Sequence, residues 1–197
     1  MAVGKKPYLE AISRHQSQQE LLIANTLQQT LLPQSNFKVE CLDTFEDIRH
    51  GDTRQAWGPL PAVIPLQKAA ICDPVTAYAG LANKSEITLK QASALNAIAH
   101  EADHIRFGSS DEAATECRAF QDMPAIARQL GASATQAKMT QQAQLFNYLG
   151  LAPHYQTTAC REGGPYDKDP HHAGLFPYPH PAVIKFGDLS MRVGQAN

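Results

Sequence analysis

The most regular pattern of hydrophobic positions begins near residue 88 and predicts a helix that ends at Gly108. Thr88 and Gln91 have the spacing of a capping box, in which each side chain bonds to the backbone of the other residue. Beyond them, apolar residues recur three or four positions apart, as on one face of a helix. These residues are Leu95, Ile98, Ala99, Ala102 and Ile105.

Two further helices are predicted between residues 109 and 150. Ser109 and Ser110 are candidate N-caps for the first of them, and the two residues that follow are acidic, as the helix dipole favours in a first turn. A kink is expected in this helix at Pro124. A second capping-box pattern at residues 133–136 opens the next helix, which ends at Gly150.

The first 80 residues follow other patterns. Residues 8–32 are polar and rich in glutamine, and their apolar positions fit one long or broken amphipathic helix, an arm packed on the body. Phe37–Cys41 alternates apolar and polar residues, as a half-buried strand does. Residues 57–66 carry three prolines among β-branched residues, which indicates an edge strand that Gln67–Cys72 could continue. We therefore expect a small antiparallel sheet.

The chain after Pro153 is rich in glycine, proline and aromatic residues, which predicts an ordered wrapping tail with a short strand at Ala182–Phe186. This tail also holds acidic and histidine residues without regular spacing. We interpret them as solvated surface groups, with a second metal site as the alternative. They are Asp167, Asp169, His171, His172 and His180.

Composition narrows the class of protein. A chain of 197 residues with 43% hydrophobic residues suggests one domain with a real core. The 17 Lys and Arg against 19 Asp and Glu, with no basic run longer than Lys5-Lys6, give no sign of a nucleic-acid partner. No apolar stretch approaches the ~18 residues of a membrane span. The first residues lack the apolar segment of a signal peptide, so none is predicted here. The alternative is a signal peptide that has already been removed.

Four cysteines are spaced widely along the chain. None lies in a CxxC pair, so neither a zinc ribbon nor a thiol redox motif is predicted. The four cysteines could form two disulfides or remain as four buried thiols. If they form disulfides, three pairings are possible. The residues are Cys41, Cys72, Cys117 and Cys160.

The strongest chemical signal is His100-Glu101-x-x-His104, inside the first of the three predicted helices. Histidines four positions apart share one helix face, so both imidazoles can reach a single metal ion. Glu101 lies beside them, where it can act as a general base on water. A hydrolytic zinc site also needs a third protein ligand and an open coordination position.

Two acidic residues of the next helix can complete such a site. If the helices pack antiparallel, Glu112 in the first turn of the second can face the last turn of the first. Glu116 lies one helical turn later on the same face and could accept the other N–H of a ligand histidine. Spacing alone permits either acid as the ligand. The alternative is an ordinary first-turn acid and a solvated surface charge.

The segment His100–His104, followed by Asp111–Glu116, resembles the gluzincin pattern of zinc metallopeptidases. The resemblance implies that His100, His104 and Glu112 are metal ligands, that Glu101 is the general base and that Glu116 orients a histidine. In thermolysin-like gluzincins the second helix reads Asn-Glu-Ala and then Asp. Here the spacer between the motifs is much shorter, and the orienting acid is Glu.

A closer resemblance, over residues 88–165, is to small bacterial proteins that pair HExxH with an Asp-Glu-Ala…Glu-Cys segment. These proteins tend to carry Cys-Arg-x-Gly-Gly-Pro near the end, which residues 160–165 match. Many are exported, so the resemblance slightly favours an extracytoplasmic location. It also implies a Cys117–Cys160 disulfide that pins the tail across the helices, with Cys41–Cys72 stapling the sheet region.

Peptide hydrolysis further requires a group that hydrogen-bonds the developing oxyanion. The sequence offers several candidates without choosing among them: His154, Tyr148, Tyr155, Tyr166 and Tyr178. Trp57 and Gly58 could begin an edge strand that pairs with an extended peptide. An ordinary hydrophobic anchor is the alternative for Trp57.

Together these features predict an α+β fold: a minimal zincin-like core of an HExxH helix and a glutamate-bearing helix, with a small antiparallel sheet and an N-terminal helical arm. The arm covers residues 1–35, the core residues 36–165, and a tail of the same domain residues 166–197. We expect a zinc metallopeptidase with one Zn²⁺ per chain and a peptide or protein substrate. The alternative is a non-catalytic, zinc-stabilised binding or structural protein with a relic site.

Overall fold

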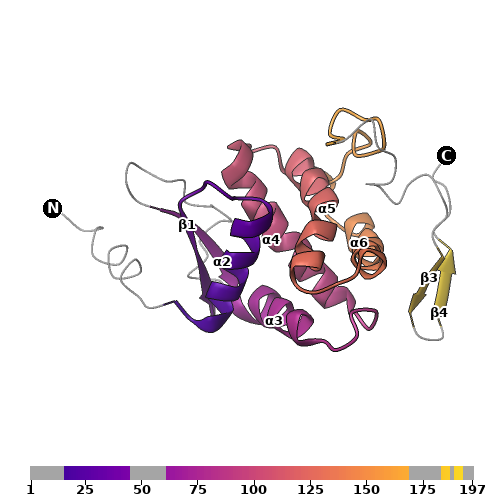
Figure 1. Cartoon of the computed structure of the whole chain (residues 1–197). Coiled ribbons are helices and arrows are strands. Elements are labelled where there is room, and N and C mark those ends of the chain that lie inside the picture. The colour runs from indigo at the N-terminus through magenta and orange to yellow at the C-terminus, as the bar shows by residue number, and fades with distance from the viewer. Residues whose placement is uncertain (1–15, 45–60, 169–182, 187–188, 193–197) are drawn as a thin grey trace.

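The computed structural model describes residues 16–44, 61–168, 183–186 and 189–192. Helices dominate these residues, and two short pairs of strands complete the expected α+β fold (Figure 1). The long helices are α2 (Gln18–Thr30), α3 (Asp73–Gly80), α4 (Leu89–Phe107), α5 (Glu112–Gln129) and α6 (Ala134–Leu149). The strands are β1 (Phe37–Leu42), β2 (Ala62–Gln67), β3 (Val183–Phe186) and β4 (Leu189–Arg192), and the short helical turns are η1 (Lys68–Cys72) and η2 (Pro153–Tyr155).

The sheet formed by β1 and β2 is parallel, so the expectation of an antiparallel sheet in this region was wrong. Phe37 pairs with Ala62, and the register continues to Leu42 and Gln67. Parallel strands need a long connection that returns the chain to the same end of the sheet, and here it runs from residue 43 to residue 61. Alternation along a strand reports burial of its faces and carries no information on the direction of its partner.

Strand β2 ends earlier than the sequence suggested. Lys68–Cys72 forms a π-helical turn instead of continuing the strand, and it leads directly into α3. Pro74 lies in the first turn of α3, where its missing N–H is no loss. Asp73 fixes the junction, because its Oδ1 accepts hydrogen bonds from Lys68 Nζ at 2.7 Å and Gln19 Nε2 at 2.8 Å.

The three helices predicted between residues 88 and 150 are confirmed, with one correction. Both expected capping boxes form, at Thr88 with α4 and at Ser133 with α6. The N-cap of α5 is Asp111 rather than Ser109 or Ser110, because the Asp111 carboxylate accepts the Ala114 N–H at 3.0 Å. The strand expected near residue 182 is also confirmed as β3, which pairs antiparallel with β4.

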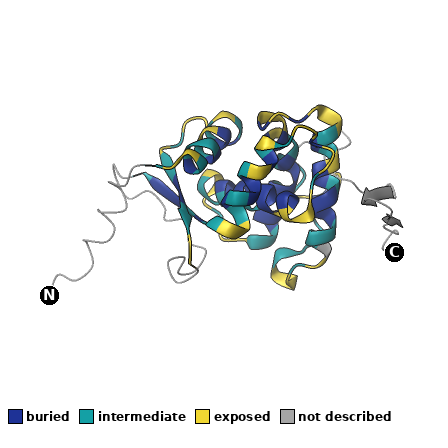
Figure 2. Ribbon diagram, turned by 90° about the horizontal axis from the view of Figure 1, so that it is seen from below, coloured by how far each residue is buried: buried dark blue, intermediate teal, exposed yellow. Residues whose placement is uncertain are grey.

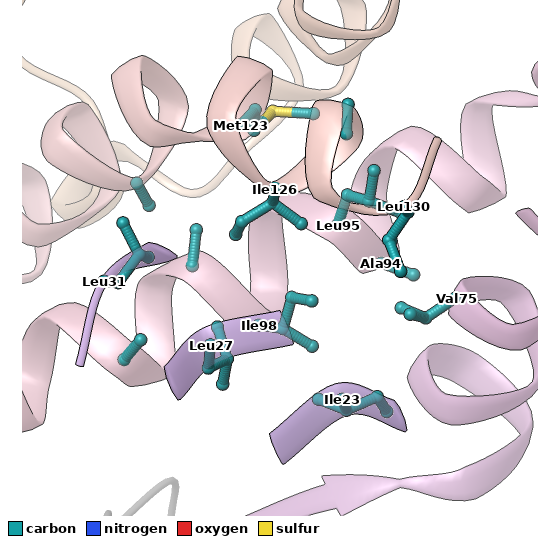
Figure 3. Close-up of a cluster of buried hydrophobic side chains, with 14 of the residues drawn as sticks. Ile23, Leu27, Leu31, Val75, Ala94, Leu95, Ile98, Met123, Ile126 and Leu130 are labelled. Carbon is teal, nitrogen blue, oxygen red and sulfur yellow. The ribbon is translucent and has the colours of Figure 1, made fainter. Parts of the chain in front are cut away.

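The hydrophobic core lies where α2, α3, α4 and α5 converge. Figure 2 shows buried residues on the facing sides of the helices and exposed residues on their outer sides. Ten of the nineteen residues of α4 are buried, so this helix runs through the interior and its polar side chains need partners. Figure 3 shows side chains from all four helices in one cluster: Ile23, Leu27, Val75, Leu95, Ile98, Met123 and Ile126.

Helix α2 is joined to the sheet by a buried carboxylate. Glu20 forms a capping box with Ser17, and its Oε1 also accepts the backbone N–H of Cys41 in β1 at 2.8 Å. The first part of the expected N-terminal helix, residues 8–15, lies outside the described residues.

Both disulfides implied by the bacterial resemblance are present. Cys41–Cys72 joins β1 to the turn before α3, and Cys117–Cys160 joins α5 to the segment after η2. They enclose sequence separations of 31 and 43 residues, which correspond to about 4 kcal/mol each in the chain-entropy account. Disulfides form and persist in oxidising compartments, so the pair indicates such an environment.

The Gly-Gly pair after Cys160 builds a tight turn that brings the chain back to α5. Gly163 adopts a φ of 67°, and a Cβ on Gly164 would collide with the carbonyl of Ala159. The returning chain is then fixed to α5, since Gln121 Nε2 donates to the Tyr166 carbonyl at 2.8 Å. Among the described helices, none combines the length and apolar character that crossing a membrane requires.

Candidate metal centre

Helices α4 and α5 run antiparallel and bring the HExxH histidines next to the first turns of α5 (Figure 1). Gly108 ends α4 at a φ of 59°, a left-handed conformation that glycine adopts without strain. Because the chain turns back so soon, His104 faces Glu112 and His100 faces Glu116. This is the arrangement that the spacing of the two motifs predicts.

Three potential ligand atoms converge between the helices. The Nε2 atoms of His100 and His104 lie 3.0 Å apart. Oε2 of Glu112 lies 3.0 Å from Nε2 of His100 and 3.6 Å from Nε2 of His104. All three ligand atoms lie within 4.8 Å of one another, so this group could hold a metal ion.

Hydrogen bonds at Nδ1 of each histidine turn Nε2 of each ring toward Oε2 of Glu112. Nδ1 of His100 donates to Oε2 of Glu116 at 2.9 Å, and Nδ1 of His104 donates to the Ser109 carbonyl at 2.7 Å. With its proton on Nδ1, a neutral imidazole presents the lone pair of Nε2. Two such lone pairs then meet beside a carboxylate oxygen. Two histidines and one carboxylate form a donor set typical of catalytic zinc sites, so the residues fit that metal.

The same contacts also accommodate a proton on His100. Burial lowers the pKa of His100, but the hydrogen bond that its ring donates to Glu116 and the charges of Glu116, Glu101 and Glu112 outweigh this effect and raise the pKa above its ordinary value. A doubly protonated His100 would bridge Glu112 and Glu116. Metal ligands must be deprotonated, so a bound ion would displace this proton.

Access to the group comes from the side of Glu112. The Glu112 side chain is 36% exposed, whereas those of His100 and His104 are each 11% exposed. The Glu116 side chain is only 5% exposed and closes the opposite side. A hydrolytic metal site requires such an open side for water and substrate.

Glu101 has the surroundings of a general base. Its Oε2 atom is buried and has no hydrogen-bond partner among the residues that the structure describes. Burial raises the pKa of Glu101 to about 7, while the charge of His100 lowers it and that of Glu112 raises it. A carboxyl group with a pKa near 7 can take up and release a proton at neutral pH.

Of the expected oxyanion candidates that the structure describes, Tyr155 packs against His100. Its ring packs edge-on against the His100 ring, with the centroids 5.9 Å apart. Burial, followed by the charges of Glu112, Glu116 and Glu101, raises the pKa of Tyr155, so its hydroxyl keeps its proton at neutral pH.

The other oxyanion candidates have different surroundings. The hydroxyl of Tyr148 accepts the Thr157 N–H, and that of Tyr166 donates to Asp111 Oδ2. His154 stacks on Tyr155 with the ring centroids 4.3 Å apart. Tyr178 lies outside the described residues.

Two partners of the site were missed by sequence reasoning. The first is the Ser109 carbonyl, a backbone group that no side-chain pattern can indicate. The second is Asn96, whose Nδ2 donates to Oε1 of Glu116 at 2.6 Å. Its signal was present in the sequence, because Asn96, His100 and His104 recur every four residues on one face of α4.

Asp103, within the HExxH motif, points away from the ligands and into the contact between α4 and α5. It is fully buried, and its Oδ2 lies 3.9 Å from Nε of Arg118 in α5. Burial, reinforced by the charge of Asp122, raises the pKa of Asp103 to about 7. This residue therefore belongs to the helix contact behind the site.

Most residues of the second metal site considered in the tail lie outside the described residues, as do Trp57 and Gly58. Those tail residues are Asp169, His171, His172 and His180. Asp167 is described, and its Oδ2 accepts the Gly163 N–H at 2.7 Å, which gives it a place in the tight turn.

Comparison with known proteins adds no relative: no family model, curated protein or solved structure matches the chain. The interpretation of the site therefore rests on its own geometry and chemistry.

Proposed function

We propose that this chain is a zinc-dependent metallopeptidase that acts in an oxidising, extracytoplasmic compartment. His100, His104 and Glu112 would hold one zinc ion, with the open side at Glu112 left for water and a peptide. When bound, zinc supplies a Lewis acid that lets water lose a proton near neutral pH. The two disulfides support the location, because they would not persist in a reducing cytosol.

The chain's own residues would carry the proton and stabilise the developing charge. Glu101 takes a proton from the water whose oxygen attacks the peptide carbonyl carbon, and later delivers it to the leaving nitrogen as the C–N bond breaks. The Tyr155 hydroxyl donates a hydrogen bond to the carbonyl oxygen as it becomes negative. Glu116 and the Ser109 carbonyl keep the two imidazole rings in position.

One observation carries this proposal: two histidine nitrogens 3.0 Å apart, each ring oriented by a bond at its other nitrogen, lie beside a carboxylate oxygen. In a purely structural pair of buried histidines, the second nitrogen of each ring would be expected to have a hydrogen-bond partner of its own. Here the rings direct their remaining nitrogens toward each other. Next to His100 in the sequence is Glu101, whose buried Oε2 has no hydrogen-bond partner among the described residues.

A glutamine substitution at Glu101 tests the proposed activity. Glu101→Gln removes the base and leaves all three ligands, so we expect zinc content unchanged and cleavage of a broad peptide library lost. Glu162→Gln, an exposed acid near the tight turn, serves as the control and should cleave as wild type does. The measurement is mass-spectrometric detection of cleaved peptides alongside metal analysis of the same samples.

The alternative protein class predicts another result. A zinc-stabilised binding or structural protein would bind zinc in all three proteins and cleave nothing in any of them. Cleavage by Glu101→Gln at the wild-type rate would instead show that another group is the base.

A further inference from the structure

We propose that Asn96 is a positioning residue of the metal centre, which acts on zinc affinity through Glu116. The inference rests on the proposed metal site and concerns a residue whose side chain bonds to Glu116. Asn96 lies in α4 one helical turn before His100 and is buried, with 4% of its surface exposed. Its Nδ2 donates to Oε1 of Glu116, whose Oε2 accepts the Nδ1 proton of His100.

Asn96 and His100 each donate a hydrogen bond to a different carboxylate oxygen of Glu116. Nδ2 of Asn96 donates to Oε1 at 2.6 Å, and Nδ1 of His100 donates to Oε2 at 2.9 Å, so the two bonds together fix the orientation of the carboxylate. Asn96 thus holds the Glu116 carboxylate turned toward His100. The carboxylate in turn keeps the imidazole ring oriented with Nε2 free for a metal ion.

The surroundings of Oδ1 indicate that Asn96 contributes its hydrogen bond to Glu116 rather than side-chain packing. Its Oδ1 is buried and has no hydrogen-bond partner among the described residues. An unpaired buried acceptor is destabilising, whereas an apolar side chain of the same size would fill the space without that penalty. Reversing the amide would bring Oδ1 against the carboxylate, so the donor orientation is set by Glu116.

A double-mutant cycle tests the inference by zinc affinity, measured by competition with a chromophoric chelator. Asn96→Leu and Glu116→Met each replace a polar side chain with an apolar one of similar size. We expect Asn96→Leu to weaken zinc binding about tenfold, the lower end for residues that support a ligand. In the Glu116→Met background the same change should alter affinity less than twofold, because its route to His100 is gone.

Gln141→Met is the matched control. Gln141 is also a fully buried amide that joins two helices, since its Nε2 donates to the Phe120 carbonyl in α5 at 2.9 Å. Its loss should lower the melting temperature of the metal-free protein as Asn96→Leu does, yet leave zinc affinity within twofold of wild type. If Asn96→Leu does not fold, Asn96→Ala takes its place in the cycle with the same expectations.

Two results would overturn the inference: unchanged zinc affinity in Asn96→Leu, or an equal loss with and without the Glu116 carboxylate. Either one leaves the proposed peptidase activity standing if wild type cleaves peptides. Zinc binding with the expected coupling, but without cleavage of any peptide, would instead remove the activity and keep the role of Asn96. A wild-type protein that binds no zinc would remove both.

Discussion

The two histidines of the candidate metal centre differ in what holds them. Nδ1 of His100 donates to a carboxylate that is itself held by Asn96, whereas Nδ1 of His104 donates to a neutral backbone carbonyl. A carboxylate acceptor makes an imidazole more basic and a stronger metal donor. His100 is therefore oriented through side chains, whereas the turn after α4 fixes His104 in place.

Glu112 and Glu116 should differ clearly when each loses its charge. Oε2 of Glu112 lies close to Nε2 of both histidines, whereas Oε2 of Glu116 bonds to Nδ1 of His100, on the far side of that ring. We expect Glu112→Gln to nearly abolish zinc binding and Glu116→Gln to weaken it ~10–100-fold. A competitive chelator titration measures both, and the reverse order would show that the two acids had exchanged roles.

Tyr155 should affect turnover without affecting metal binding. Removal of its hydroxyl in Tyr155→Phe keeps the ring packed against His100 but takes away the proposed oxyanion donor. We expect kcat to fall roughly 10²–10³-fold with KM and zinc affinity little changed, the range seen when one oxyanion donor is lost. Tyr166→Phe, which removes a hydroxyl bonded to Asp111, is the control. An equal loss in both variants would argue against a direct role for Tyr155.

Among single residues, those brought together by the spacing of a helix could be predicted from the sequence. His100, His104, Glu112 and Glu116 are placed by spacings of four and by one short turn. The oxyanion candidate could not be chosen, because Tyr155 reaches the site from η2, beyond the reach of any local pattern. Asn96 was missed because an isolated asparagine on a buried helix face has no chemistry until its partner is known.

At the level of elements, the site depends on a short turn and on a tethered segment. Gly108 and the Asp111 cap fix how α5 meets α4. Cys117 follows Glu116 directly in α5 and is bonded to Cys160, so the disulfide holds the segment containing η2 and Tyr155 near the ligands. The tight turn at residues 160–164 then returns the chain to α5.

The two disulfides should therefore have different effects on the segment that carries Tyr155. Changing either pair to alanine should destabilise the protein by about 4 kcal/mol, since the two separations are similar. Only loss of Cys117–Cys160 should release the segment, which hydrogen exchange would detect as faster exchange of the amides at residues 154–160. Similar exchange in both variants would contradict a tethering role for this disulfide.

Helix boundaries were predictable because their signals are local: capping boxes at both expected positions and a left-handed glycine after α4. Strand direction was not, since parallel pairing of β1 and β2 is decided by the path of the chain between them. Helix α3 was missed because its eight residues follow the π-helical turn Lys68–Cys72 without a side-chain cap, and Pro74 reads equally well as a strand terminator.

On the scale of the whole molecule, α4 has two roles. It runs through the core with Leu95 and Ile98 against α2 and α5, and it also carries both histidines. Polar side chains on a buried helix need hydrogen-bond partners within the protein. Asn96 and Glu116 provide these partners on the buried side of His100. On the more exposed side, His100, His104 and Glu112 form the group that could hold a metal ion.

The metal content of the purified protein tests this account most directly. We expect about one zinc per chain by elemental analysis, lost on treatment with a chelator and regained on addition of zinc. His104→Ala should hold none, while Glu162→Gln, which changes an exposed acid in the tight turn, should hold as much as wild type. A wild-type protein that contains no zinc, and takes up none on reconstitution, would contradict the account, because the two histidines and Glu112 would then be joined by a proton rather than by a metal ion.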